Sequence, residues 1–156
     1  MAGTTFKYKD QIRSIGGCPA TDCVEGERDS YRWVHAEPIT EDFLPQALED
    51  PVRRRPIDET DLERRCLSWG LSMYDTIEAA IVRFKQVISR IRGAKQPDFR
   101  TQKGDSVAFI QLKPSHGRTS PSNKEQHFTL FEYEDVDLRN DIVKIINIFD
   151  DHGEHG

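Results

Sequence analysis

The segment Asp75–Gly93 constrains the fold of this chain more than any other. Its apolar residues recur every three or four positions, which places them on one face of a helix: Ile77, Ile81, Phe84, Val87, Ile88 and Ile91. Asp75 and Glu78 have the spacing of a capping box, and Gly93 is the type of residue that ends helices in a left-handed conformation. The pattern predicts one amphipathic helix and a packed core beneath it.

Composition predicts one domain over residues 1–149, followed by a frayed polar tail at 150–156. The chain has 156 residues, of which 36% are hydrophobic and 31% charged, so we expect a thin core with long polar loops. The net charge of −5 disfavours generic nucleic-acid binding. No apolar run reaches the roughly 18 residues that a membrane span needs, and no signal-peptide core opens the chain. We therefore expect a cytoplasmic protein without membrane contact.

Three cysteines, Cys18, Cys23 and Cys66, are an odd number, which predicts free thiols in a reducing compartment. Cys18 and Cys23 could hold zinc together with His35 and Cys66, because thiolates and imidazoles are the ligands that zinc prefers. Structural zinc sites usually have two close ligand pairs, however, and this chain has one. We expect no metal.

Four segments have the composition of strands: Tyr31–His35, Leu67–Met73, Ser106–Leu112 and His127–Glu134. The last two are expected to pair antiparallel, because the chain between them holds no helix for a parallel crossover. The predicted fold is α+β, a small mainly antiparallel sheet with the Asp75–Arg92 helix packed across one face and shorter peripheral helices.

The ends and connections carry weaker patterns. Residues 138–149 fit either a helix face or a strand rich in β-branched residues, and we favour the helix. Short helices are expected after a Thr40 cap and at Asp58–Arg65. Residues 1–30 are expected to be irregular apart from a short strand near Phe6–Tyr8, and so are Pro51–Asp61, which contains the Arg53–Arg55 run, and Pro97–Gly104. Lys113–Gln126 is expected to be a long loop, either a functional flap or a disordered excursion.

Common catalytic signatures are missing from the sequence. It has no Ser-His-Asp order, nucleophile elbow, phosphate-binding glycine loop or His-Glu-x-x-His motif. His116 lies in the long loop and His127 opens a predicted strand, and either could act as a general base if the loop folds over a pocket. The field of Arg53–Arg55 is largely offset by acidic neighbours.

The order of the chemistry-bearing segments resembles that of ADP-ribosyltransferase-like domains. The segments are Tyr31-Arg-Trp-Val-His35 on an early strand, Gly70–Ala80 at a strand-to-helix junction, a central strand at Val107–Leu112, and Glu132-Tyr-Glu134 on a late strand. The resemblance implies that Arg32 or His35 holds a nicotinamide dinucleotide and that Ser72 or Tyr74 lines the nicotinamide pocket. It implies that Glu134 stabilises the oxocarbenium-like centre.

Two functions follow, and whether the chain is an enzyme stays open. The first is a small cytosolic accessory module without a cofactor, which docks on another protein through an edge strand or through Tyr31, Trp33 and Trp69. The second is an ADP-ribosyltransferase-like enzyme that consumes NAD, with the residues named above.

Overall fold

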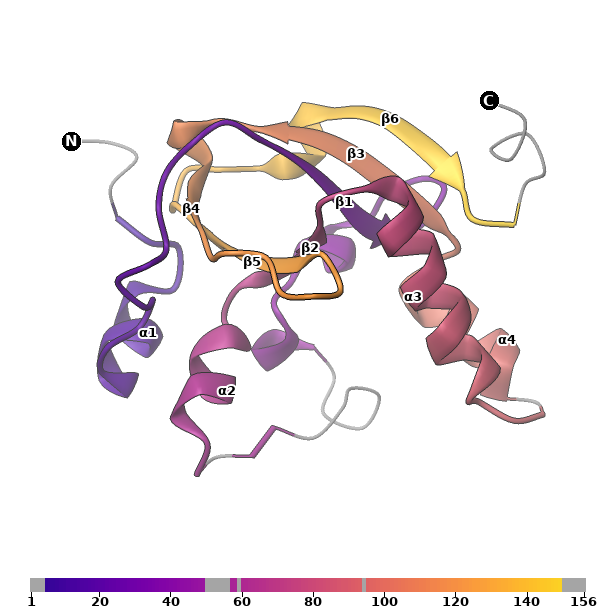
Figure 1. Ribbon diagram of the computed structural model, residues 1–156, viewed down its shortest axis with the longest axis horizontal. Coiled ribbons are helices and arrows are strands. Elements are labelled where there is room, and N and C mark those ends of the chain that lie inside the picture. The colour runs from indigo at the N-terminus through magenta and orange to yellow at the C-terminus, as the bar shows by residue number, and fades with distance from the viewer. Residues whose placement is uncertain (1–4, 50–56, 59, 94, 150–156) are drawn as a thin grey trace.

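A six-stranded antiparallel sheet carries the fold in the computed structural model, which describes residues 5–49, 57–58, 60–93 and 95–149 (Figure 1). The strand order is β4-β5-β2-β1-β3-β6, and every neighbouring pair is antiparallel. The strands are β1 (Arg28–Val34), β2 (Leu71–Tyr74), β3 (Ser106–Leu112), β4 (Gly117–Thr119), β5 (His127–Glu132) and β6 (Ile142–Asn147). Helices accompany this sheet, so the α+β prediction is confirmed.

The sheet consists of two three-stranded halves that are joined at one residue pair. β1 pairs with β3 along its whole length, and β2 pairs with β5 along its whole length. Between β1 and β2, however, the register contains only Tyr31 opposite Tyr74. The two strands therefore diverge, and the sheet is split along its middle.

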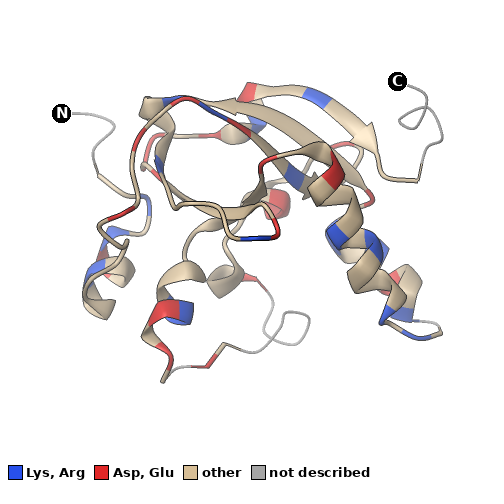
Figure 2. Cartoon of the chain, viewed as in Figure 1, with Lys and Arg blue, Asp and Glu red and all other residues tan. Residues whose placement is uncertain are grey.

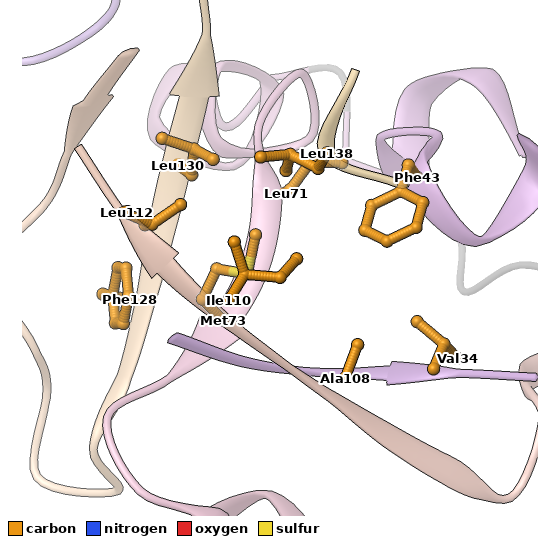
Figure 3. Close-up of a cluster of buried hydrophobic side chains, with 10 residues drawn as sticks. All are labelled: Val34, Phe43, Leu71, Met73, Ala108, Ile110, Leu112, Phe128, Leu130 and Leu138. Atoms are coloured by element: carbon orange, nitrogen blue, oxygen red, sulfur yellow. The ribbon is translucent and has the colours of Figure 1, made fainter. Parts of the chain in front are cut away.

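A buried apolar cluster fills the space between the two halves (Figure 3). Leu71 and Met73 of β2 face it, whereas the alternate residues Ser72 and Tyr74 lie on the opposite face of the strand, as the twofold alternation of a strand requires. The cluster comprises Val34, Phe43, Leu71, Met73, Ala108, Ile110, Leu112, Phe128, Leu130 and Leu138. This alternation decides which residues of β2 can contribute to a surface site.

The amphipathic segment forms α3 (Ile77–Ser89), which lies against β1, β2 and β3 and buries Ala80 and Phe84. Its predicted cap is wrong. Thr76 is the N-cap, and its hydroxyl accepts from the backbone N–H of Ala79 at 3.1 Å. Asp75, which follows β2 directly, instead forms an ion pair at 2.9 Å with Arg28, the first residue of β1. Gly93 is left-handed as predicted, but the helix has already ended at Ser89.

The other helices are short: α1 (Lys9–Ile15), α2 (Leu62–Leu67), α4 (Lys95–Lys103), and 3₁₀ helices at Thr40–Phe43, Gln46–Leu48, Pro114–His116 and Leu138–Asp141. α1 and α4 overturn the prediction of irregular structure, since each is held by tertiary packing rather than by its own pattern. Ile12 and Ile15 of α1 join a buried cluster, and Phe99 of α4 packs 5.3 Å from Phe84. Thr40 lies inside its 3₁₀ helix and does not cap it.

Three predictions about the second half of the chain are also wrong. Half of residues 138–149 form strand β6 after a single 3₁₀ turn, because the β-branched residues pair with β3. β5 pairs with β2 and β4 instead of β3. The Lys113–Gln126 loop contains β4, which lets the chain cross from β3 to the far edge of the sheet.

Two of the three cysteines are bonded to each other, so the free-thiol prediction is wrong for them. Cys18 and Cys66 form a disulfide across a Cα–Cα distance of 5.6 Å, while Cys23 is a buried free thiol in the same apolar cluster. The fold brings the segment after α1 against the last turn of α2, within the reach of a disulfide. The bond uses two of the sulfurs that the zinc alternative required.

Some predicted features lie outside the described residues, namely the Arg53–Arg55 run and the tail at 150–156. Within the described ranges, none of the helices has the length and apolar character needed to cross a bilayer.

Candidate functional site

A cleft of about 570 Å³ opens where β1 and β2 diverge. Its floor is formed by β2 and the first half of β5, and its walls come from α2, α3, α4, the 3₁₀ segment after β1 and the loop before β5. The volume lies within the range of about 300–1,000 Å³ that is typical of small-molecule sites. The split in the sheet thus produces a ligand-sized hollow lined by these seven parts of the chain and by Arg32 and Trp33 of β1.

Arg32 reaches across the split and replaces the missing strand pairing. Its Nη1 donates to the Ser72 carbonyl oxygen on β2 at 2.8 Å, and its Nε donates to the Asp42 carbonyl oxygen at 2.8 Å. A longer bond of 3.4 Å joins Nη2 to the Leu44 carbonyl oxygen. A guanidinium has five N–H donors, so two remain beyond these three bonds. Arg32 therefore supports the cleft and still presents charge at its wall.

The charge of Arg32 is partly buried, and burial is the largest influence on its pKa, which is lowered. Glu49, Glu132, Asp42 and Tyr74 act in the opposite direction at longer range. No ion pair among the described residues involves this guanidinium. Its positive charge is thus balanced by carbonyl dipoles rather than by a carboxylate.

Tyr74 lies at the centre of an aromatic group beside the floor. Its ring stacks on Trp33 with centroids 5.9 Å apart and meets His127 edge-on at 5.3 Å. Trp33 in turn packs on Phe84 and Phe99, and its Nε1 donates to the Ala80 carbonyl oxygen at 2.9 Å. Burial raises the pKa of Tyr74 to about 12 despite the nearby Arg83. The phenol is therefore uncharged at neutral pH.

Arg83 adds a second cation from α3. It lies close enough to the Tyr74 hydroxyl to lower the pKa of that phenol, and no ion pair in the described part of the chain involves it. By contrast, Lys103 and Glu49 on the cleft wall pair with each other at 2.7 Å. Figure 2 shows acidic and basic residues interspersed along the helices and loops. Arg32 and Arg83 thus differ from the other two cations that line the cleft, Arg64 and Lys103, which pair with carboxylates. The cleft does not lie on a broad basic surface.

His127 and Glu125 enter the cleft from the start of β5 and from the loop before it. Burial lowers the pKa of His127, Glu125 opposes this effect, and Arg83 and Arg32 lower the pKa further. The imidazole is therefore neutral at pH 7. The carboxylate of Glu125 is exposed at the cleft rim.

Three predicted dinucleotide-site residues, Arg32, Ser72 and Tyr74, line this one cleft. His35 does not. Its Nδ1 bonds to the Asp42 carboxylate and its Nε2 to the Thr101 carbonyl oxygen, both at 2.7 Å. Both partners are acceptors, so both ring nitrogens carry protons. Burial alone would lower the pKa of His35, but these bonds outweigh it and the pKa is raised. His35 is a structural cation beside the cleft wall.

Glu134 lies outside the cleft. It is exposed beyond the end of β5, and its backbone N–H donates to the Thr5 carbonyl oxygen at 2.8 Å. His127 begins the same strand, so at about 3.3 Å per residue Glu134 is roughly 20 Å away from it. Its neighbour Glu132 is buried and pairs with Lys7 at 3.1 Å. The structure therefore separates the predicted catalytic carboxylate from Arg32, Ser72 and Tyr74.

The three predicted docking aromatics are packed within the protein. Tyr31 stacks on Phe109 with centroids 5.0 Å apart, and Trp69 lies 5.5 Å from Tyr8. Trp33 belongs to the aromatic group of the cleft. Each is half-buried, so a partner would meet only part of its ring.

Sequence reasoning missed Arg83 and Glu125 and left His127 as one of two possible bases. Arg83 lies one helical turn before Val87, which also lines the cleft, but the helix pattern assigned it only to the polar side. No local signal marks Glu125, because it approaches the cleft only once β5 pairs with β2.

In chemical terms the cleft can bind an anion and an aromatic ring together. Its lining combines four cationic side chains, four carboxylates, aromatic and hydroxyl groups and a neutral imidazole, and Arg32 and Arg83 are the two cations that no ion pair of the described residues involves. No group of three or more His, Cys, Asp or Glu residues that could hold a metal ion occurs in the described ranges. The sequence matches no protein-family model, and comparisons with curated proteins and with solved structures find no match.

Proposed function

We propose that the cleft binds a nicotinamide dinucleotide and that the chain consumes it as an ADP-ribosyltransferase-like enzyme. The single observation that carries this proposal is that Arg32 of β1 lines one cleft of ligand size together with Ser72 and Tyr74 of β2, about 40 residues further along the chain. The resemblance to that family selects these three residues, together with His35 and Glu134, before any spatial information is used.

The charges of the cleft suit the diphosphate of such a ligand. Arg32 keeps two N–H donors beyond its carbonyl bonds, and Arg83 lies on the facing helix beside the Tyr74 hydroxyl. Charge-assisted bonds from a guanidinium to phosphate are stronger than neutral ones. Two guanidiniums without carboxylate partners therefore favour a doubly charged anion over a neutral ligand.

The remaining lining suits a nicotinamide riboside. Trp33, Tyr74 and Phe99 provide aromatic surface, and the exposed Ser72 hydroxyl can bond to a carboxamide. Loss of nicotinamide leaves positive charge on the ribose, which a carboxylate stabilises. In this proposal Glu125, which lines the cleft, takes that role in place of Glu134.

The test is nicotinamide release from NAD, measured by liquid chromatography, for the wild type and for a matched pair of variants. Glu125→Gln removes the carboxylate in the cleft, and we expect turnover to fall by about 100-fold or more, the usual effect of removing one electrostatic stabiliser. Glu134→Gln removes the exposed carboxylate outside the cleft and should leave turnover unchanged.

Absence of both nicotinamide release and NAD binding by the wild type would refute the proposed function. Loss of turnover in Glu134→Gln with normal turnover in Glu125→Gln would refute the assigned carboxylate. The accessory-module hypothesis stays a prediction. It would gain support if the protein did not bind NAD and a single stoichiometric protein were recovered with it from the native host.

A further inference from the structure

His127 differs from the other histidines of the described chain in its hydrogen bonding. His35 and His116 each use both ring nitrogens, His116 by accepting from the Lys113 N–H at 2.9 Å and bonding to Asp141 at 3.0 Å. The ring nitrogens of His127 have no hydrogen-bond partner among the described residues, although the side chain is largely shielded and lines the cleft. Its imidazole is therefore available to a ligand.

The backbone around His127 is fixed on both sides. The Asn123 side-chain oxygen accepts from the His127 N–H at 3.0 Å, and the Asn123 N–H donates to the His127 carbonyl oxygen at 2.9 Å. Gln126 adopts a left-handed φ of 61°, and its carbonyl oxygen accepts from the Asp75 N–H at 2.9 Å. The turn is thus tied to the segment that begins α3. A histidine held in this way loses little freedom when it acts.

The groups around the imidazole keep it neutral. Tyr74 of β2 covers one side as an uncharged phenol, and Arg83 approaches from α3 and Arg32 from β1. Glu125 of its own loop is the one anion among the described residues that raises its pKa. Burial and the two guanidiniums lower the pKa of His127 and together outweigh Glu125. The unbonded imidazole can accept a proton at neutral pH.

We propose that His127 is the general base of the reaction in this cleft and that the second substrate is a hydroxyl group, supplied by water or by an alcohol. The inference rests on the proposed function and adds the chemical class of the group that accepts the ADP-ribose. The lining carries both signs of charge in equal number, so a neutral hydroxyl enters the cleft without a net electrostatic barrier. A hydroxyl also needs to lose a proton as it attacks, which the imidazole provides for.

The step balances without any further reactant. The bond between ribose C1′ and the nicotinamide nitrogen breaks, and its electron pair leaves with nicotinamide. A new bond forms between C1′ and the acceptor oxygen, and the hydroxyl proton passes to a ring nitrogen of His127. The imidazolium then releases this proton to solvent, so one NAD and one hydroxyl compound give nicotinamide, an O-linked ADP-ribose and one proton.

The test compares the pH dependence of kcat for wild type, His127→Ala and the control His116→Gln. A base must be unprotonated, so the wild-type kcat should fall as the pH drops through the lowered pKa of His127. In His127→Ala we expect kcat to fall by about 10²-fold or more, without this acidic limb and with NAD affinity within about threefold of wild type. Added imidazole should restore part of the rate. His116→Gln should keep the wild-type profile in its folded fraction.

Mass spectrometry of products formed with added methanol identifies the acceptor. Free ADP-ribose alone shows that water is the hydroxyl, and a methyl derivative shows that alcohols enter as well, so either product supports the inference. The inference is overturned, while the proposed function stands, if the kcat of His127→Ala still falls at acidic pH or if imidazole does not restore the rate of this variant. A wild type that releases no nicotinamide overturns both.

Discussion

Replacing Arg32 should destabilise the whole fold, although its side chain borders an open cleft. Two of its hydrogen bonds, to the Ser72 and Asp42 carbonyl oxygens, are 2.8 Å long and connect β2 and the 3₁₀ segment to β1. Bonds to a charged group contribute about 1.5–3 kcal/mol each, so their loss costs about 3–6 kcal/mol in total. Relief of the desolvation of the charge offsets part of this cost. For Arg32→Met we expect a fall of about 2–4 kcal/mol in the free energy of unfolding.

Urea unfolding followed by tryptophan fluorescence measures this change, since Trp33 is the next residue along β1. Arg32→Lys should lose less stability than Arg32→Met, because its ammonium can still bond to one or two of the three carbonyl oxygens. Arg83→Met is the matched control, a cleft guanidinium that bridges no strands, and should stay within about 1 kcal/mol of wild type. If Arg32→Met were as stable as wild type, the idea that Arg32 holds the split sheet together would be wrong.

Three further predictions concern stability. The pKa of His35 is higher in the folded protein than in the unfolded chain, where it is about 6.5, so the protonated side chain stabilises the fold. This contribution is complete at pH values below about 6.5 and disappears as the pH rises through the pKa of the folded state. Urea midpoints of wild type should therefore decline over that interval, and those of His35→Gln should not. Reduction of the Cys18–Cys66 disulfide, which spans 48 residues, should lower the free energy of unfolding by about 2–4 kcal/mol. Dithiothreitol should have no such effect on Cys18→Ser. Gly104→Ala should cost more than about 3 kcal/mol, because a Cβ would lie 2.1 Å from a carbonyl oxygen of β1. Gly16→Ala, with a similar φ and open space around it, should cost only about 1–2 kcal/mol, and urea unfolding of both variants measures the difference.

The fold was predictable where the pattern of one segment was decisive. Ser106–Leu112 is apolar apart from Ser106 and Gln111 and forms β3 with the predicted bounds, because five of its seven residues are buried. Residues 142–147 fit both the periodicity of a helix and that of a strand, and the pairing of β6 with β3 makes them a strand. The α4 segment is polar and without period, and Phe99 alone attaches it to the aromatic group. Long-range pairing of this kind leaves no mark on a local window.

The candidate site was predictable only in part, for the same reason. Arg32, Ser72 and Tyr74 lie on strands whose neighbourhood could be expected from their order along the chain. Glu134 was misplaced because the start of β5, and not its end, meets the cleft. A one-dimensional pattern does not specify which end of a strand adjoins a site. Glu125 lines the cleft because it lies just before the start of β5.

Calorimetric titration of NAD into the protein tests the central claim, that this cleft is a dinucleotide site, most directly. The account predicts saturable binding of one NAD per chain, weakened about tenfold or more in Arg83→Gln, since one charge-assisted bond is lost. Arg90→Gln changes an exposed arginine of the same helical segment that does not line the cleft, and it should bind like wild type. Absence of binding heat in the wild type, or equal affinity in wild type and Arg83→Gln, would contradict the account.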